Sequence, residues 1–97
     1  MKRANIRRYG ERAYLQIENG RWLRKDGIVA IVDLDKSTIA RQTRIFLEKK
    51  EKEGLLTVAS AGLPKSFIVY DDGRKEQVFL SVFSPDVLKN RIANSEE

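Results

Sequence analysis

The sequence predicts a small α+β domain of about six short, mainly antiparallel strands and two helices. Three observations lead to this prediction. Several short apolar stretches have strand-type patterning, and Asn-Gly and Asp-Gly turn signals lie between them. The third observation is that two other stretches combine helix-type apolar spacing with capping residues. Their order is three strands, a helix, a short strand, two further strands and a helix. The 97 residues accommodate one such domain with a modest core.

The first three strands precede the first helix. Apolar and polar residues alternate over 13–17, which predicts a strand with one buried face. Asn19-Gly20 is a strong hairpin signal, so we expect a partner strand over about 22–24. The run IVAIVDL, residues 28–34, is β-branched and apolar on both faces. It predicts a central strand that is buried on both sides.

A helix is predicted over about 37–52, with Asp35 or Ser37 as its N-terminal cap and Gly54 at its C-terminal end. Its apolar and charged residues fall on separate faces. The apolar face holds Ile39, Thr43, Phe46 and Leu47, and the charged face holds Arg41, Arg44, Glu48, Glu51 and Lys52.

This helix could be a DNA-reading helix or a core helix whose charges face water. Arg44 with Glu48, and Glu48 with Lys52, form i,i+4 pairs of opposite sign, whereas base-reading arginines are usually free of such carboxylates. The pattern therefore favours a solvated charged face. Ile45 is an apolar residue on that face, and it is either an isolated exposed residue or a contact between subunits.

The C-terminal half predicts three strands and a helix. LLTVA (55–59) is typical of a short strand, and SFIVYDDG (66–73) and QVFLSVF (77–83) predict a hairpin joined across the polar loop 71–76. Ser84-Pro85 predicts the start of a final helix that runs through Ile92. We therefore expect a basic N-terminal arm over 1–12, the folded domain over 13–92 and a frayed tail over 93–97.

The net charge of +5 is concentrated near the N-terminus. Residues 1–25 contain eight basic and two acidic residues and sum to +6, so the remaining residues sum to −1. A block of this kind suits a polyanion, because each neutralised phosphate releases condensed counterions. The alternative is a solvated arm without a partner, and the arm by itself does not decide between the two.

Composition argues against an enzyme, a metal centre and a membrane protein. The chain contains neither cysteine nor histidine, which removes the commonest metal ligands and the commonest general base. Asp71-Asp72 is explained as part of a turn before Gly73. No apolar run has the length of a membrane span and no signal peptide is evident. We expect a soluble cytoplasmic protein with no cofactor and no small-molecule ligand.

Trp22 lies among Arg21, Arg24 and Lys25 and has two interpretations. An aromatic ring between basic residues can stack on nucleic acid bases. A tryptophan on a hairpin strand is more often a core residue or an interface anchor, and we favour that interpretation.

Segments of the chain resemble the RemA/RemB family of bacterial extracellular-matrix (biofilm) regulators, and more closely its RemB branch. The matching segments are YLQI (14–17), KDGIVAIVD (25–33), TRIFL (43–47), LPKSFIV (63–69), VFLS (78–81) and VLKNR (87–91). The resemblance rests on their order and spacing. It implies a LytTR-like or RemA-like fold and a DNA-binding transcriptional regulator without a helix-turn-helix. It also implies a ring of subunits that presents basic side chains to DNA along its outer rim.

The chain departs from the RemA branch at positions that matter for DNA contact. Where that branch has an arginine pair after a glycine, Leu63 and Pro64 follow Gly62, and its arginine before the third strand falls at Gly27. The family's usual glutamate in TREFL is Ile45 here. DNA contact would therefore come from other basic residues of this chain.

We accordingly predict a homo-oligomeric DNA-binding regulator, possibly cyclic, that binds DNA phosphates. The predicted DNA-binding residues are Arg7, Arg8, Arg12, Arg21, Arg24, Lys25 and Lys65, and the predicted subunit-interface residues are Trp22, Ile45, Val82 and Phe83. The alternative is a homo-oligomeric assembly or adaptor protein that binds protein partners and not DNA.

Overall fold

The computed structural model describes residues 13–34, 41–58 and 62–95. Strands β1 (Tyr14–Glu18) and β2 (Arg21–Arg24) form the predicted antiparallel hairpin. Gly20 adopts a φ of 80° in the turn, a conformation that glycine enters without steric cost. Leu15 and Leu23 are paired across the hairpin and are both buried, so one face of the hairpin belongs to the core.

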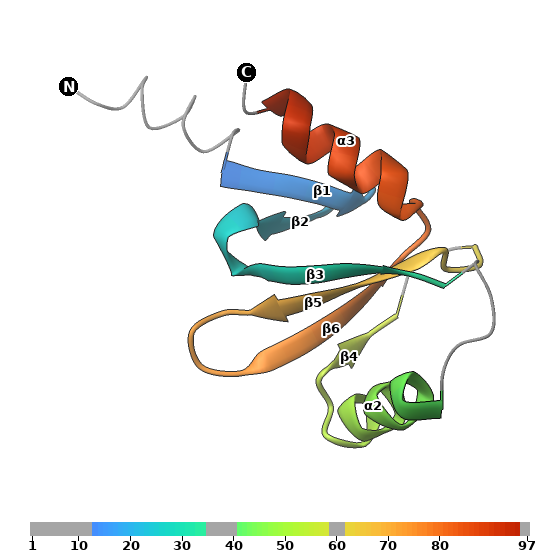
Figure 1. Ribbon diagram of the computed structural model, residues 1–97. Coiled ribbons are helices and arrows are strands. Elements are labelled where there is room, and N and C mark those ends of the chain that lie inside the picture. Colours follow the sequence, from blue (N-terminus) through green and yellow to red (C-terminus); the bar gives the residue numbers. More distant parts are fainter. Residues whose placement is uncertain (1–12, 35–40, 59–61, 96–97) are drawn as a thin grey trace.

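The main sheet has four strands in the order β3-β5-β6-β4 (Figure 1). Strands β5 (Ser66–Asp71) and β6 (Glu76–Ser81) form the predicted antiparallel hairpin, and β3 (Ile28–Asp33) pairs antiparallel with β5. The short strand β4 (Leu56–Thr57) runs parallel to β6. The described elements therefore have the predicted order βββαβββα.

The prediction that β3 is a central strand was wrong. Within the described chain β3 pairs with β5 alone and lies at the edge of the sheet, and the side chain of Val29 is exposed. The strand that is buried on both faces is β5, whose residues 66–69 are all buried. The apolar run in β3 reflects contacts on both faces of a covered sheet, and such contacts do not determine the position of a strand within the sheet.

Two apolar clusters lie on opposite faces of the sheet. Ile68 and Phe79, which are register partners, belong to one cluster together with the hairpin residues and Leu88. Val69 and Val78 are also partners, and with Phe67 they form the other cluster. Successive residues of a strand point to opposite faces, so β5 supplies both clusters.

Helix α2 (Arg41–Lys52) covers the second cluster only in part. Phe46 and Leu47 pack against it, as predicted, but no residue of α2 is fully buried. The predicted cap residues Asp35 and Ser37, and Ile39, lie outside the described residues. At the C-terminal end, Gly54 adopts a φ of 74°, and the N–H of Leu55 donates to the carbonyl of Lys50, as expected for a glycine-terminated helix.

Helix α2 is attached to the sheet by Lys50. Its ammonium group donates to the carbonyl of Glu76 at 2.9 Å, lies 3.3 Å from the Glu76 carboxylate and sits 5.7 Å from the centre of the Phe46 ring. The ion pairs found among the described residues do not include the two i,i+4 pairs expected for Glu48. Exposed ion pairs of this kind gain little energy and lose side-chain entropy. The side chains of Arg44, Glu48 and Lys52 are therefore exposed to water without pairing with one another.

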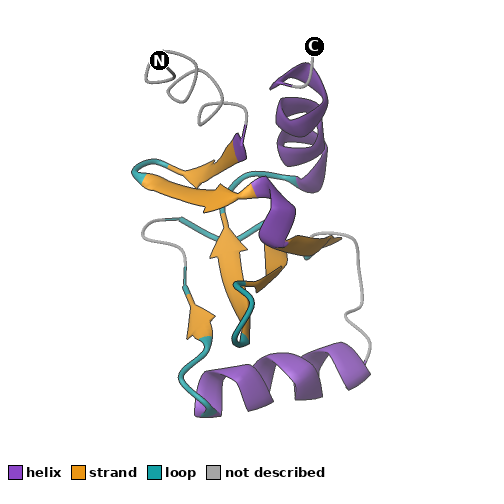
Figure 2. Cartoon of the chain, turned by 90° about the vertical axis from the view of Figure 1, so that its left-hand side faces the viewer, coloured by secondary structure: helices purple, strands orange, loops and turns teal. Residues whose placement is uncertain are grey.

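Helix α3 (Pro85–Ser95) lies beside β1, at the end of the molecule opposite α2 (Figures 1 and 2). Its start follows the prediction, because the Ser84 hydroxyl accepts a hydrogen bond from the Val87 N–H at 3.3 Å. Leu88 is fully buried, and the Arg91 guanidinium stacks 4.4 Å from the Phe83 ring centre and donates to the Gln16 carbonyl. The helix continues to Ser95, three residues beyond the predicted end.

Within the described residues, no helix combines the length and the apolar character needed to cross a bilayer.

Candidate nucleic-acid interface

Two of the predicted DNA-binding residues lie at one end of the sheet, which we call the η1 end. It consists of Arg24, the single 3-10 turn η1 (Lys25–Gly27) and the β5–β6 turn, residues 72–75. Figure 1 shows η1 and this turn on the same side, at the left of the sheet. The described part of β1 also begins there, because Tyr14 is the register partner of Arg24. The basic arm 1–12 is therefore attached at the η1 end.

A pocket of about 300 Å³ lies between η1 and the β5–β6 turn. It is lined by Arg24, Asp26, Gly27, Tyr70, Asp71, Asp72 and Gly73. Two carboxylates of its lining hold the turn: the Asp71 carboxylate accepts the Gly73 N–H at 2.8 Å, and the Asp72 carboxylate accepts the N–H groups of Arg74 and Lys75. Hydrogen bonds from the backbone of Lys75 and Arg74 lower the pKa of Asp72, so this carboxylate stays charged to lower pH than an ordinary aspartate does.

Arg24 does not present a free charge. Its guanidinium donates to both carboxylate oxygens of Asp26, at 3.2 Å and 2.7 Å. The hydrogen bond to Asp26 raises the pKa of Arg24. The pair is exposed, with side-chain exposure of 59% for Arg24 and 71% for Asp26, so Arg24 can still reach a phosphate while Asp26 offsets part of its charge.

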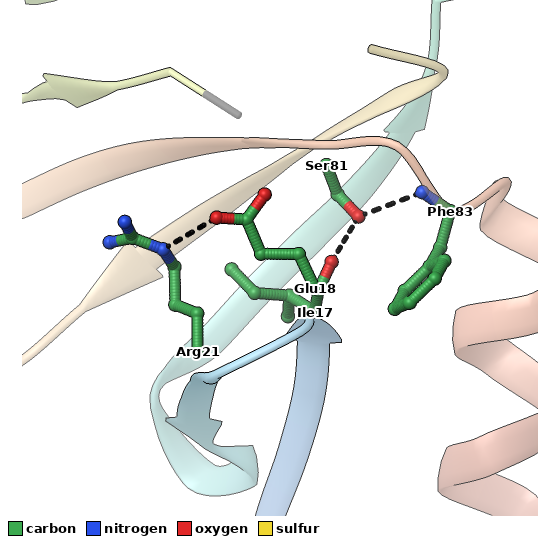
Figure 3. Close-up of polar contacts among 5 residues, drawn as sticks. All are labelled: Ile17, Glu18, Arg21, Ser81 and Phe83. Atoms are coloured by element: carbon green, nitrogen blue, oxygen red, sulfur yellow. Dashed lines mark hydrogen bonds and ion pairs between the residues drawn. The ribbon is translucent and has the colours of Figure 1, made fainter. Parts of the chain in front are cut away.

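Arg21 is paired with a buried carboxylate of its own chain (Figure 3). Its Nε donates to the carboxylate of Glu18 at 3.1 Å, and the Glu18 side chain is only 4% exposed. The guanidinium also lies 5.9 Å from the centre of the Phe79 ring. A buried carboxylate requires a compensating charge, and Arg21 supplies it to Glu18. The charge of Arg21 is therefore largely offset within the domain and contributes little to binding an external partner.

The same close-up shows how the hairpin is held to the main sheet. The hydroxyl of Ser81, at the end of β6, donates to the carbonyl of Ile17 and accepts the N–H of Phe83 (Figure 3). Ser81 and Ile17 are both fully buried. These bonds fix the position of Glu18 and Arg21 relative to the sheet.

Lys65 lies at the opposite end of the sheet from Arg24 and Lys25. Its carbonyl accepts the N–H of Leu34, just beyond the end of β3. The register pairs Ile28 with Tyr70 and Asp33 with Ser66, so the length of β3, roughly 17 Å, separates the two ends. The predicted basic residues of the described chain therefore do not form one cluster, and Arg7, Arg8 and Arg12 lie outside the described residues.

Sequence reasoning missed two exposed cations of the η1 end. Arg74 and Lys75 are both exposed in the β5–β6 turn, and their backbone N–H groups are fixed by Asp72. The sequence analysis treated this loop only as a connection between strands. Two adjacent basic residues at the tip of a hairpin that is held by an aspartate were the signal that could have identified them.

The four predicted interface residues divide into two groups. Trp22 is 55% exposed on β2 and Ile45 is 52% exposed on α2, and these two elements lie far apart in both views of the chain. Phe83 instead packs against the first apolar cluster and under Arg91, and Val82 is half-buried. The side chains of Trp22 and Ile45 are thus exposed and available to another molecule. The Phe83 ring is instead covered by Arg91 and the first apolar cluster of its own chain.

The fold and this surface together define a class of protein. It is a small α+β domain with exposed cations and isolated exposed aromatic residues. The family described as RemA-like, Extracellular matrix regulatory protein A-like, matches residues 14–92, so the chain belongs to the RemA-like family. This is a family of regulatory proteins and not of enzymes. A search of curated proteins finds no match.

Proposed function

We propose that this chain is a DNA-binding transcriptional regulator of extracellular-matrix (biofilm) genes that acts in the cytoplasm without a helix-turn-helix. The observation that carries the proposal is the membership of the RemA-like family over residues 14–92, combined with a basic arm attached at the η1 end. Within the family we place the chain nearer the RemB branch. Gly27 and Leu63 occupy the positions where the RemA branch has arginines.

The charge distribution indicates which residues supply the affinity. The arm 1–12 has five basic residues and one acidic residue and carries +4, so residues 13–97 together carry only +1. In the described domain, Glu18 compensates Arg21 and Asp26 compensates Arg24. Most of the counterion release on DNA binding must therefore come from the arm, with Lys25, Lys65, Arg74 and Lys75 as further contacts.

Repetition of the arm makes this weak electrostatic contact effective. A few phosphate contacts from one chain hold duplex DNA only weakly, but several arms on one oligomer bind with a raised effective concentration. The exposed apolar residue Ile45 supplies a surface for self-association. We therefore include a homo-oligomer, cyclic in arrangement, in the proposed function.

A charge-neutralising variant of the full chain tests the DNA-binding part. Arg7, Arg8 and Arg12 are replaced by glutamine together, and the affinity for a duplex is measured by mobility shift at several salt concentrations. Each lost phosphate contact changes the slope of log affinity against log salt by about 0.9, so the slope should become shallower by up to about 3 per chain. Affinity at low salt should fall at least about tenfold.

The matched control removes the same charge from α2. Arg41, Arg44 and Lys52 are exposed, and their joint replacement by glutamine changes the net charge equally. This control should keep the duplex affinity within about threefold, because α2 lies at the opposite end of the molecule from β1, the first strand after the arm in the sequence (Figure 1). Equal losses of duplex affinity in the two triple variants would show that the affinity depends on the net charge of the protein and not on the position of the basic residues. A duplex affinity that does not change with salt would contradict the phosphate-contact mechanism, and no binding of duplex by the wild type at low salt would support the adaptor alternative.

A further inference from the structure

The outer face of the β1–β2 hairpin carries two exposed aromatic residues that the proposed function does not use. Tyr14 is the register partner of Arg24 and Gln16 is the partner of Trp22, so these four side chains share the face opposite buried Leu15. Tyr14 is 43% exposed and Trp22 is 55% exposed. The two rings are diagonal neighbours on adjacent strands, within reach of one extended ligand.

The composition of this face suits a nucleic acid better than a protein. The hairpin strands have only five and four residues, and their outer face alternates aromatic with polar side chains, so it lacks the contiguous apolar centre of a stable protein interface. Each ring instead has a polar neighbour across the strand pair, Arg24 beside Tyr14 and Gln16 beside Trp22. Exposed aromatic rings beside a cation and an amide are found on surfaces that stack unpaired bases.

Charge complementarity identifies the same kind of ligand. The arm, with a net charge of +4, joins the domain next to Tyr14, and exposed Arg24 borders the face. The Arg24 guanidinium uses two of its nitrogens for Asp26 and keeps further N–H donors for an oxygen of a phosphate. A phosphate group held by Arg24 would therefore lie beside two rings on which unpaired bases can stack.

We propose that the Tyr14–Trp22 face binds single-stranded nucleic acid by stacking unpaired bases on these two rings. This goes beyond contact with duplex phosphates, because a duplex keeps its bases stacked on one another and offers none to the rings. It also replaces, for Trp22, the subunit-interface role predicted from the sequence. Regions of a promoter that are opened, or a transcript, would then be recognised by a surface separate from Ile45.

The protein provides its own reporter for the test, because Trp22 is the only tryptophan. Full-length protein is titrated with an oligothymidine of fifteen nucleotides, an oligouridine of the same length, and a duplex of the same length. The two single strands should quench the Trp22 fluorescence and the duplex should not. The oligothymidine and oligouridine titrations show whether the site takes DNA, RNA or both.

Substitutions at Trp22 separate stacking from apolar contact. The affinity of a dye-labelled oligothymidine is measured for Trp22→Phe, which keeps a planar ring, and for Trp22→Leu, which keeps apolar area without a ring. Trp22→Leu should lower the affinity about five- to one-hundred-fold, the range for loss of one stacked base, and Trp22→Phe should lower it less. Val29→Ala is the control, since Val29 is 62% exposed on β3 and lies outside this face.

Two results would overturn the proposal. One is an unchanged oligothymidine affinity in Trp22→Leu together with no quenching in the wild type. The other is a fall in molecular mass by light scattering in Trp22→Leu with equal losses for single strand and duplex, which would assign Trp22 to a subunit contact. The proposed function has a separate test. It fails if the wild type shows no salt-dependent duplex binding in the mobility shift, and the Trp22 fluorescence titration does not measure this.

Discussion

Gly27 is enclosed where η1 leads into β3. A Cβ atom added there would lie 2.6 Å from Cε1 of Tyr70 and 2.8 Å from the carbonyl oxygen of Asp71, closer than real contacts allow. Its φ is not in the left-handed region, so steric contact alone requires the glycine. An arginine at this position could not be accommodated while Tyr70 and the β5 backbone keep their places.

We expect Gly27→Ala to lower the free energy of unfolding by about 1–3 kcal/mol, the usual cost of overpacking. Part of the clash is with a ring and part with the backbone, and these parts can be separated. Gly27→Ala should cost less stability in a Tyr70→Ala background than in the wild type, because the ring that it meets is gone. In a Tyr70→Phe background it should cost as much as in the wild type, because the ring is kept. Urea unfolding of the wild type, the three single variants and the two double variants supplies the measurement.

The outcome that contradicts this assignment is full stability of Gly27→Ala with no coupling to Tyr70. In that case β3 and β5 would be able to separate at the η1 end without cost, and the absence of an arginine at this position would need another explanation.

At the scale of elements, α2 is the least firmly held part of the described fold. It has no buried residue, and its contacts with the sheet are concentrated in Phe46, Leu47 and Lys50. The Phe46 and Phe67 rings lie 6.4 Å apart between centres, so one aromatic contact joins the helix to the second apolar cluster. A helix held this way derives its stability from packing of one stripe and not from its charged face.

Phe46→Ala should therefore destabilise the protein by about 2 kcal/mol, less than the 3–5 kcal/mol typical of a fully buried phenylalanine, because Phe46 is only half-buried. Lys49→Ala, an exposed neighbour on the same helix, should change stability by no more than about 0.5 kcal/mol. Thermal unfolding followed by circular dichroism gives both values. Similar losses in the two variants would mean that α2 is stabilised by its own residues and not by the sheet.

At the scale of the whole molecule, the described chain leaves apolar side chains exposed on α2 and in the segments next to β4 and β5. Ile45 on α2, Val58 after β4 and Leu63 before β5 are all more than half exposed, and β3 is an edge strand without a charged residue from 28 to 32. Edge strands of this kind and exposed apolar side chains favour association with another chain. Association through these positions would add apolar burial that the isolated chain lacks.

We predict that the protein is a homo-oligomer at micromolar concentration. Light scattering should give a mass that is a multiple of 11.2 kDa. Ile45→Glu places a charge in the proposed contact on α2 and should lower this mass, whereas Lys49→Glu changes charge on the same helix without removing an apolar residue and should not. A wild-type mass equal to that of one chain would exclude both the oligomer and the multivalent route to DNA.

The sequence by itself determined the number, type and order of the described elements, both hairpin turns, the capping of α3 and the two covered faces of the sheet. These features are local, since alternation, turn residues and caps act within a few positions of one another. The resemblance carried by segments between Tyr14 and Arg91 likewise agreed with the family match over 14–92.

Only the tertiary structure decided how these elements meet. It placed β3 at the edge and β5 in the centre, because strand order depends on hydrogen bonds between segments far apart in the chain. It paired Arg21 with buried Glu18 and separated Lys25 from Lys65 by the length of β3, so a row of basic residues in the sequence became dispersed positions with different partners. It also left Trp22 in solvent on the outer face of the hairpin. A side chain's partner and exposure are set by the segments that pack around it, and local sequence patterns contain no information about which segments those are.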